Sequence, residues 1–303
     1  MAANKSKKRG IRRAPSRTRK PARKPSPAGR PMIGFIGAGN MARSLAAGLL
    51  KNGWPRGRLL MSDPDGAQRR TLEQTLRVRT EADNNAVAAR ANILILAVKP
   101  QILRDVAQTL AGAVQRQRPL IISIAAGVRL GDVERWLGGA LAVVRAMPNT
   151  AALIGSGASG LYANPATDSA MRAQAESILR AVGVTAWVDD EDQLDTVTAL
   201  SGSGPAYFFL MMEALEGAAI EQGLAPPQAR LLTLETAYGA AKMALEGAEE
   251  PASLRARVTS PGGTTERAIE VLQRGDLAGL MRDALRAAAE RARELAKLLG
   301  TNS

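Results

Sequence analysis

Residues 32–42 read MIGFIGAGNMA and place a short apolar strand, a glycine turn and the start of a helix in one stretch. The apolar residues of 33–36 are typical of a buried parallel strand. Gly37 and Gly39 allow the backbone to turn tightly and to approach a pyrophosphate, and the third glycine position is Ala42, which the fingerprint tolerates. The helix that follows aims its unpaired N–H groups at such an anion. The stretch therefore predicts a dinucleotide-binding turn.

Apolar runs alternate with helical patterns up to about residue 190, which predicts an α/β Rossmann-type doubly wound parallel sheet. Further strands are expected at residues 59–61, 93–98, 120–124, 143–145, 159–162 and 184–188, with helices at 67–76, 102–110, 130–137 and 170–181. From about Asp192 the strand signal stops. Helices broken by Gly and Pro are expected at 192–200, 205–222, 226–246, 252–258, 265–274 and 277–298.

These patterns divide the chain into a basic tail (1–31), a dinucleotide-binding domain (32–190) and an all-helical domain (191–303). The tail holds twelve of the 41 Lys and Arg residues and none of the 28 Asp and Glu residues, so the rest of the chain is nearly neutral. Its Pro, Ser and Ala content predicts a disordered extension. Nucleic-acid binding through the tail is the alternative, although it has no aromatic residue to stack on bases.

The composition also excludes several kinds of chemistry. The chain has no Cys and no His, so it has no thiol nucleophile, no histidine base and no usual zinc ligand, and we expect no metal. The uncharged run at residues 199–212 is too short to cross a bilayer, and the tail has no apolar region typical of a secretory signal. We expect a cytoplasmic protein.

In a doubly wound sheet, ligands bind outside the carboxyl ends of the strands. The second strand is followed by Ser62 and Asp63, with Arg69 and Arg70 shortly after. An acid at this position would hold the ribose 2′-hydroxyl of NAD, whereas Ser62 with a nearby arginine would hold the 2′-phosphate of NADP. The residues alone leave both readings open.

The loops after the later strands also carry candidate residues. Small residues at 125–127 would let a nicotinamide lie against the backbone, and Lys99 is either a donor to ribose or substrate, or an exposed loop charge. Asn149 and Thr150 would bond a carboxamide or form a local turn through the Asn side chain.

Two loops of the helical half have a composition suited to ligands. Residues 201–205 read SGSGP, and residues 260–265 read SPGGTT and lead into a helix, so the second loop is either an anion-binding helix N-terminus or a turn with a Thr cap. Many of the apolar positions of 206–241 are Ala, Gly or Met, which allow helices to approach closely but leave little bulk for a self-contained core. The last helix adds an apolar stripe (Leu277, Leu280, Ala284, Ala288, Ala292, Leu295, Leu299). We expect a second subunit to complete this core.

Seven segments occur in an order that matches a known family: GFIGAGNMA, AVKPQ, SIAAGV, RAMPNT, ALSGSGPAYFF, GAAKM and VTSPGGTTERAI. Over residues 32–298 the chain resembles pyrroline-5-carboxylate reductases. The resemblance implies a Rossmann domain followed by an all-helical dimerisation domain, with homodimers often assembled into rings. It also implies reduction of L-1-pyrroline-5-carboxylate to L-proline, the last step of proline biosynthesis, with NADPH or NADH as hydride donor. The basic tail is not part of the family pattern.

The resemblance also assigns residues. The cofactor-binding residues it implies are Ile36, Gly37, Ala38, Gly39, Asn40, Met41, Ser62, Asn84, Ala97, Val98, Lys99, Pro100, Ala125, Ala126 and Gly127. The substrate-binding residues it implies are Ser201, Gly262, Gly263, Thr264 and Thr265. We expect NADPH as the cofactor, with NADH also accepted, and assign Thr265 the catalytic role of bonding the ring nitrogen.

The absence of histidine is compatible with this chemistry, because a protonated cyclic imine accepts hydride without a metal while the protein supplies orientation. The alternative within enzymes is another Rossmann imine reductase or a β-hydroxyacid dehydrogenase. The latter uses a lysine in the first helix after the sheet, and the SGSGPAYFF segment contains none.

Overall fold

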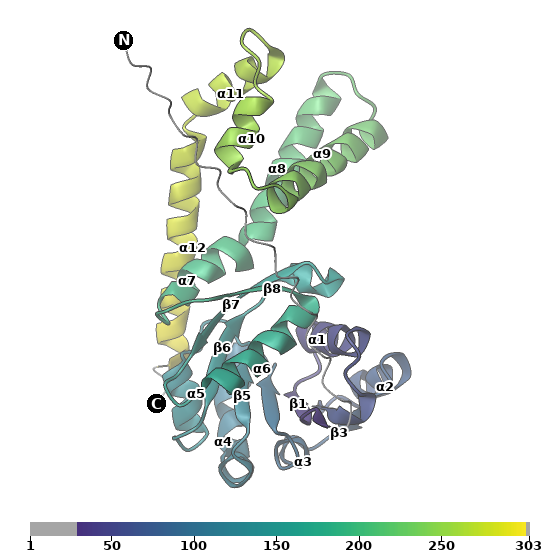
Figure 1. Ribbon diagram of the computed structural model, residues 1–303, viewed down its shortest axis with the longest axis vertical. Coiled ribbons are helices and arrows are strands. Elements are labelled where there is room, and N and C mark those ends of the chain that lie inside the picture. Colours follow the sequence, from purple (N-terminus) through teal and green to yellow (C-terminus); the bar gives the residue numbers. More distant parts are fainter. Residues whose placement is uncertain (1–28, 301–303) are drawn as a thin grey trace, which may run out of the picture.

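The structure, a computed structural model, describes residues 29–300 and consists of a sheet flanked by helices at one end and a helical region at the other (Figure 1). Residues 1–28 of the predicted basic tail lie outside this range. The predicted fold class is confirmed: strands alternate with helices up to residue 187, and only helices follow.

One eight-stranded sheet forms the base of the molecule, in the order β3-β2-β1-β4-β5-β6-β7-β8. Its strands are β1 (Ile33–Ile36), β2 (Leu59–Ser62), β3 (Arg79–Glu81), β4 (Ile93–Leu96), β5 (Leu120–Ser123), β6 (Val143–Met147), β7 (Gly157–Ala163) and β8 (Gly183–Trp187). The four strands β1, β2, β4 and β5 are buried at every position, because helices cover both faces of a parallel sheet.

Helices pack on both faces and enclose two apolar cores. One core joins the sheet to α1 (Asn40–Lys51), α2 (Gly66–Thr75) and α6 (Ser169–Leu179), the other to α3 (Asn84–Ala88), α4 (Pro100–Gln117) and α5 (Leu130–Trp136). Short turns η2 (Arg56–Arg58), η3 (Thr150–Ile154) and η4 (Arg180–Val182) connect the elements. The layers are those of a doubly wound fold.

The sheet differs from the sequence prediction in two places. β7 runs antiparallel to β6, and β8 parallel to β7. The connection at residues 148–156 is too short for the crossover that a parallel strand requires, so the chain turns back beside β6. The other difference is the missed pair β3 and α3: β3 is a polar edge strand, and α3 is too short to give a periodic signal.

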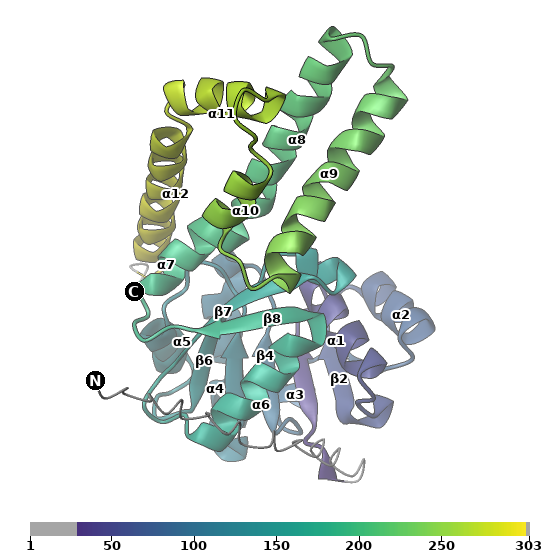
Figure 2. The ribbon, with the colours of Figure 1, turned by 45° about the horizontal axis from the view of Figure 1, so that its top comes forward.

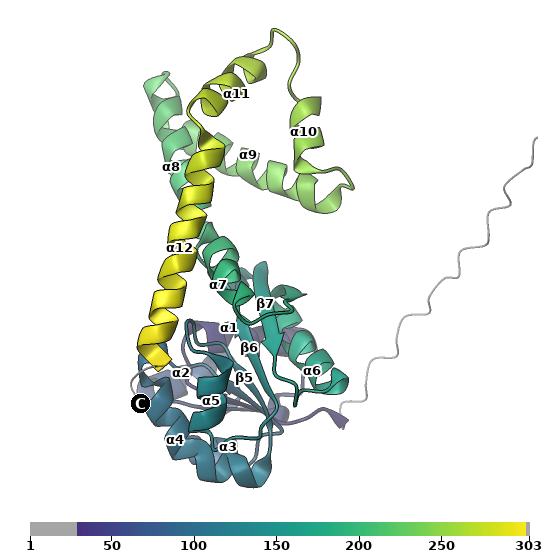
Figure 3. The ribbon, with the colours of Figure 1, turned by 90° about the vertical axis from the view of Figure 1, so that its left-hand side faces the viewer.

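The second region is helical and extends away from the sheet (Figures 2 and 3). It contains α7 (Gln193–Val197), the π-helical turn η5 (Thr198–Gly202), α8 (Gly204–Glu221), α9 (Pro226–Glu246), α10 (Pro251–Arg257), α11 (Thr264–Arg274) and α12 (Leu277–Gly300). α8 and α9 form an antiparallel hairpin, and α12 returns alongside α7 to the sheet. No helix within residues 29–300 has the length and apolarity of a membrane span.

The predicted apolar stripe of α12 is only partly buried. Ala292 is covered, together with Ala289 and Ala296, whereas Leu280 is 62% exposed and Leu277 is also at the surface. The stripe is therefore covered at its C-terminal end, where Leu299 also packs against the core of the sheet region, and is exposed toward its N-terminal end.

A network of ion pairs joins the two regions. Arg145, at 3% side-chain exposure in β6, lies 2.9 Å from Glu191 and 3.7 Å from Asp195, which is fully buried. Arg129, just before α5, contacts Asp192 and Asp195. Burial alone would lower the pKa of Arg129, but the hydrogen bond that Arg129 donates to Asp192 and the charges of the neighbouring carboxylates outweigh burial and raise the pKa. The start of the helical region is therefore fixed to the sheet.

Candidate functional site

The glycine turn after β1 has the geometry of a dinucleotide-binding turn. Gly37 has φ +95°, and a Cβ there would lie 2.9 Å from the carbonyl oxygen of Ala97, so no other residue fits without strain. Gly39 caps the N-terminus of α1, and a Cβ at Gly39 would meet open space. No side chain therefore covers the start of α1 at Gly39, and the unpaired N–H groups of its first turn are accessible to a pyrophosphate.

The end of β2 supplies the residues beside this turn. The Ser62 hydroxyl is buried and donates to the carbonyl oxygen of Phe35 at 3.2 Å. The Asp63 carboxylate accepts N–H bonds from Ala38 and Asp65, both at 3.0 Å. Ser62 therefore faces the sheet, while Asp63 ties the β2 end to the glycine turn.

Three arginines gather around this strand end. Arg43 donates to the carbonyl oxygen of Ala38 at 3.1 Å and to Gln68. Arg69 donates to the carbonyl oxygen of Asp63 at 2.7 Å, and both Arg69 and Arg70 place guanidinium nitrogens close to the start of α2. Arg70 is exposed. The rim of the predicted cofactor site is therefore cationic.

The other predicted cofactor residues lie along the same edge, because β3, β2, β1, β4 and β5 are parallel. Asn84 begins α3 after β3. The segment 97–100 links β4 to α4, with Ala97 N–H bonded to the carbonyl oxygen of Ile36 at 2.8 Å and Lys99 exposed at the N-cap of α4. Residues 125–127 follow β5, and Gly127 has φ +73°. The structure thus places the predicted cofactor residues along one edge of the sheet, but the Ser62 side chain is buried and bonded to Phe35, so the predicted contact of its hydroxyl with a 2′-phosphate does not fit this structure.

Asn149, at the end of β6, forms two long-range hydrogen bonds in place of the local turn considered from the sequence. Its side-chain Nδ2 donates to the carbonyl oxygen of Ser201 at 3.0 Å, and its Oδ1 accepts from the N–H of Ala158 at 3.1 Å. Ser201, predicted to bind substrate, therefore lies beside the carboxyl edge. Sequence reasoning singled out Asn149 but missed this link and the π-helical turn.

The SPGGTT loop forms the N-terminus of α11, with Gly263 as the N-cap. The N–H of Gly262 donates to the carboxylate of Glu266 at 2.7 Å, and the N–H of Gly263 donates to the carbonyl oxygen of Ser260. The N–H groups of Thr264 and Thr265 belong to the first helical turn, where backbone donors have no intrahelical partner. These donors, together with the N–H of Glu266 in the same turn, are available to an anion.

This loop lies far from the cofactor edge of its own chain. Figures 2 and 3 show α11 and the loop that leads into it on the side of the helical region away from the sheet. Gly262 and Thr264 are exposed. The structure therefore does not bring the predicted substrate loop and the predicted cofactor residues together within one chain.

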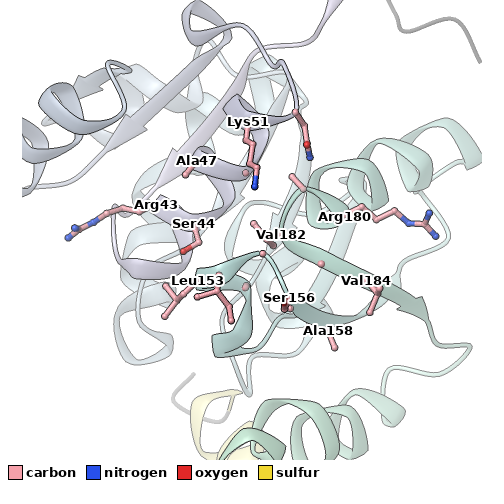
Figure 4. Close-up of a pocket in the computed structure, with 18 of the residues that line it drawn as sticks. Arg43, Ser44, Ala47, Lys51, Leu153, Ser156, Ala158, Arg180, Val182 and Val184 are labelled. Atoms are coloured by element: carbon pink, nitrogen blue, oxygen red, sulfur yellow. The ribbon is translucent and has the colours of Figure 1, made fainter. Parts of the chain in front are cut away.

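A separate hollow of about 1080 Å³ lies beside α1 (Figure 4). Arg43, Ala47 and Lys51 line one side of it, and Leu153 and Val184 line the other. None of the predicted cofactor or substrate residues lines this hollow. This hollow is therefore not the predicted cofactor or substrate site, despite its volume.

Comparison with known proteins adds independent findings. Residues 191–295 match the family described as pyrroline-5-carboxylate reductase dimerisation, and residues 32–127 match the family described as NADP oxidoreductase, coenzyme F420-dependent. The chain is 49% identical over 270 residues to a pyrroline-5-carboxylate reductase of Pseudomonas aeruginosa, covering 89% of this chain and 98% of the relative. It is 42% identical to that of Vibrio alginolyticus, covering 88% and 98%.

Solved structures of pyrroline-5-carboxylate reductases also resemble this chain. A pyrroline-5-carboxylate reductase from Coxiella burnetii superposes with a TM-score of 0.86 at 46% identity, covering 88% of this chain and 99% of that one. A pyrroline carboxylate reductase from Plasmodium falciparum, solved with NADP bound, superposes with a TM-score of 0.77 at 26% identity, covering 88% and 98%.

Proposed function

The chain belongs to the pyrroline-5-carboxylate reductases, and on that premise we propose that it reduces L-1-pyrroline-5-carboxylate to L-proline with hydride from a nicotinamide cofactor. The observation that carries the proposal is the 49% identity to such a reductase along 89% of the chain. The two family matches, over residues 32–127 and 191–295, include the glycine turn and the SPGGTT loop. We place the reaction in the cytoplasm, as the last step of proline biosynthesis.

The cofactor half of the site is the carboxyl edge of the sheet. When bound, the nicotinamide supplies hydride, and the chain supplies orientation. The α1 N-terminus behind Gly37 and Gly39 would hold the pyrophosphate, and the backbone at residues 97–100 and 125–127 would border the ribose and nicotinamide. Asn84, at the start of α3, would complete the adenosine side.

The substrate half is the SPGGTT loop. The N–H groups of Thr264 and Thr265 would hold the substrate carboxylate at the α11 N-terminus, with Gly262 and Gly263 shaping the loop through their own backbone bonds. The Thr265 hydroxyl would bond the ring nitrogen and help to retain its proton, which keeps the imine carbon electrophilic. Ser201 would contact the same ring from the sheet side.

The two halves would meet across a homodimer. The loop of one chain lies far from its own glycine turn (Figures 2 and 3). The helices that carry the loop expose large apolar side chains. A partner chain would cover these side chains and bring its own SPGGTT loop to the cofactor edge. Rings of such dimers are the larger assembly that the family resemblance implies.

We propose NADPH as the preferred cofactor, with NADH also accepted. Asp63 and Asp65 both accept backbone N–H bonds, so their carboxylates are already engaged. Arg69 and Arg70 stand at the start of α2, where a 2′-phosphate would gain charge-assisted hydrogen bonds. The NADP bound to the Plasmodium falciparum relative is compatible with this preference.

The direct test is an assay of cofactor oxidation. The purified chain is given NADPH or NADH with pyrroline-5-carboxylate, and proline is quantified. We expect turnover with both cofactors and a higher kcat/KM with NADPH. Absence of proline with either cofactor would refute the function.

Complementation tests whether the site is shared. Thr265→Ala removes the hydroxyl from the substrate half, and Gly39→Asp places a carboxylate against the pyrophosphate where the structure has room for it. Each variant alone should lose most activity. Coexpressed with different tags, they should regain about a quarter of the wild-type sites, because a mixed dimer then holds one intact pair of halves. A site contained in one chain would regain none.

A further inference from the structure

The π-helical turn η5 leaves two backbone carbonyls without their usual helical donors. In an α-helix the carbonyl of Ser201 would accept the N–H of residue 205, but that residue is Pro205, which has no N–H. The carbonyl of Ala199 would accept the N–H of Ser203, but that N–H donates instead to the carbonyl of Thr198 at 2.8 Å, the wider spacing of a π-helix.

Side chains from other positions satisfy both carbonyls. Asn149 Nδ2 donates to the carbonyl oxygen of Ser201 at 3.0 Å, and the Tyr207 hydroxyl donates to the carbonyl oxygen of Ala199 at 3.0 Å. Asn149 Oδ1 meanwhile accepts from the N–H of Ala158 at 3.1 Å. A reversed amide would set donor against donor and acceptor against acceptor, so the orientation of Asn149 is fixed by both partners.

Asn149 also occupies a position that connects the two parts of the proposed site. It follows β6 at the carboxyl edge of the sheet. Met147, two residues earlier, packs against Gly202: a Cβ added to Gly202 would lie 2.9 Å from the Cε of Met147. The end of β6 therefore contacts both of the last residues of the π-turn, Ser201 through a hydrogen bond and Gly202 through packing.

We propose that Asn149 is a positioning residue for the reduction. It supplies the hydrogen bond that Pro205 cannot give to the Ser201 carbonyl, and thereby holds Ser201 at a fixed place beside the cofactor edge. The inference rests on the proposed function, in which Ser201 contacts the imine. It assigns Asn149 no contact with the substrate: its side-chain oxygen and one of its two N–H groups are bonded within the chain.

The test compares Asn149→Ala with a matched control, Asn164→Ala, in the full-length protein. Asn164 is also an Asn that bridges two backbone groups of the β6 region, donating to the carbonyl of Leu141 at 2.7 Å and accepting from Val143 at 3.1 Å, but at the opposite end of the strand. Both variants should lower the Tm. Only Asn149→Ala should raise the KM for pyrroline-5-carboxylate, by about tenfold, with NADPH affinity measured without substrate unchanged.

A double-mutant cycle distinguishes positioning from a general loss of structure. If Asn149 acts through Ser201, then Asn149→Ala adds little to the KM effect of Ser201→Ala. Additive effects, or an equal KM increase in Asn164→Ala, would overturn the proposal. Wild-type turnover is measured alongside, so that failure of the reaction itself is recognised separately.

Two further variants keep the test decisive if Asn149→Ala does not fold. Asn149→Asp keeps an acceptor for the Ala158 N–H and removes the donor to the Ser201 carbonyl. Tyr207→Phe removes the other side-chain support of the same turn. Both should raise the KM for the imine in the same direction, Tyr207→Phe by less. A wild-type KM in Asn149→Asp would overturn the proposal.

Discussion

The sheet region and the helical region of this chain bury their apolar side chains to different degrees. In the sheet region, whole strands are inaccessible, and two cores fill both faces of the sheet. In the helical region, α8 buries only Gly204, α9 only Ala229, and α10 and α11 no residue at all. Phe208, Phe209 and Leu210 are each at least 60% exposed. The first region holds its own core, whereas the second requires another chain to cover its apolar surface.

The largest expected effect comes from a charge in the exposed apolar surface. Phe209→Asp in α8 should dissociate the dimer, because a carboxylate would have to be buried without a partner. Because the proposed site is shared, activity should fall by more than about 100-fold while NADPH still binds the sheet region. Sedimentation velocity and a cofactor titration measure the two quantities.

The matched control places the same charge on the sheet region. Ile102 in α4 is 49% exposed, and Ile102→Asp should leave the dimer intact. If Phe209→Asp also remains dimeric, the α8 surface is not the interface, and the contrast between the two regions loses its explanation.

The ion-pair network at the junction should give the next largest effect. Arg145→Ala leaves Glu191 and the fully buried Asp195 without this partner, and removing one member of a buried pair costs about 3–5 kcal/mol. Arg135→Ala, which breaks an exposed pair with Asp132, should cost at most about 1 kcal/mol. Urea unfolding measures both. Equal losses would show that the junction is no more stabilising than a surface pair.

Two truncations of similar size should separate the regions further. Ile122→Ala in β5 creates a cavity in a fully buried core and should cost about 2–5 kcal/mol of unfolding free energy without altering the dimer dissociation constant. Leu210→Ala, at a position 66% exposed in the single chain, should instead raise that constant by about tenfold. Dilution experiments with both variants test the distinction, and an unchanged constant in Leu210→Ala would argue against it.

The same contrast between buried and exposed segments determines which elements can be predicted from the sequence. The buried strands carry uninterrupted apolar runs, so β1, β4 and β5 were identified, whereas the polar edge strand β3 carries no such run. The direction of β7 depends on the length of its connection, which an apolar pattern does not report. In α12 the spacing indicates which residues share a face, and the structure shows that Ala292 and Leu299 of that face are covered within the chain whereas Leu280 is not.

The candidate site was predictable on one side only. Glycine spacing and strand ends mark the glycine turn, Lys99 and residues 125–127 as candidates for cofactor binding, because a parallel sheet brings all its carboxyl ends to one edge, whereas Asn84 follows from the family resemblance alone. The sequence also marked the SPGGTT loop, but not its distance from that edge, which depends on how the helices are arranged. The role of Asn149 had a readable signal, since Pro205 leaves the Ser201 carbonyl without a helical donor, but identifying the donor required the three-dimensional structure.

The smallest expected effect concerns the cationic rim of the sheet region. Arg70→Ala should raise the KM for NADPH by about tenfold, because one charge-assisted hydrogen bond to the 2′-phosphate is lost, while the KM for NADH stays the same. Arg56→Ala is the matched control, an exposed arginine at the other end of β2, and should change neither. A parallel rise for both cofactors in Arg70→Ala would mean that the arginine acts on the fold of the β2–α2 turn and not on the phosphate. Because the change lies wholly within the sheet region, the dimer dissociation constant should remain that of the wild type.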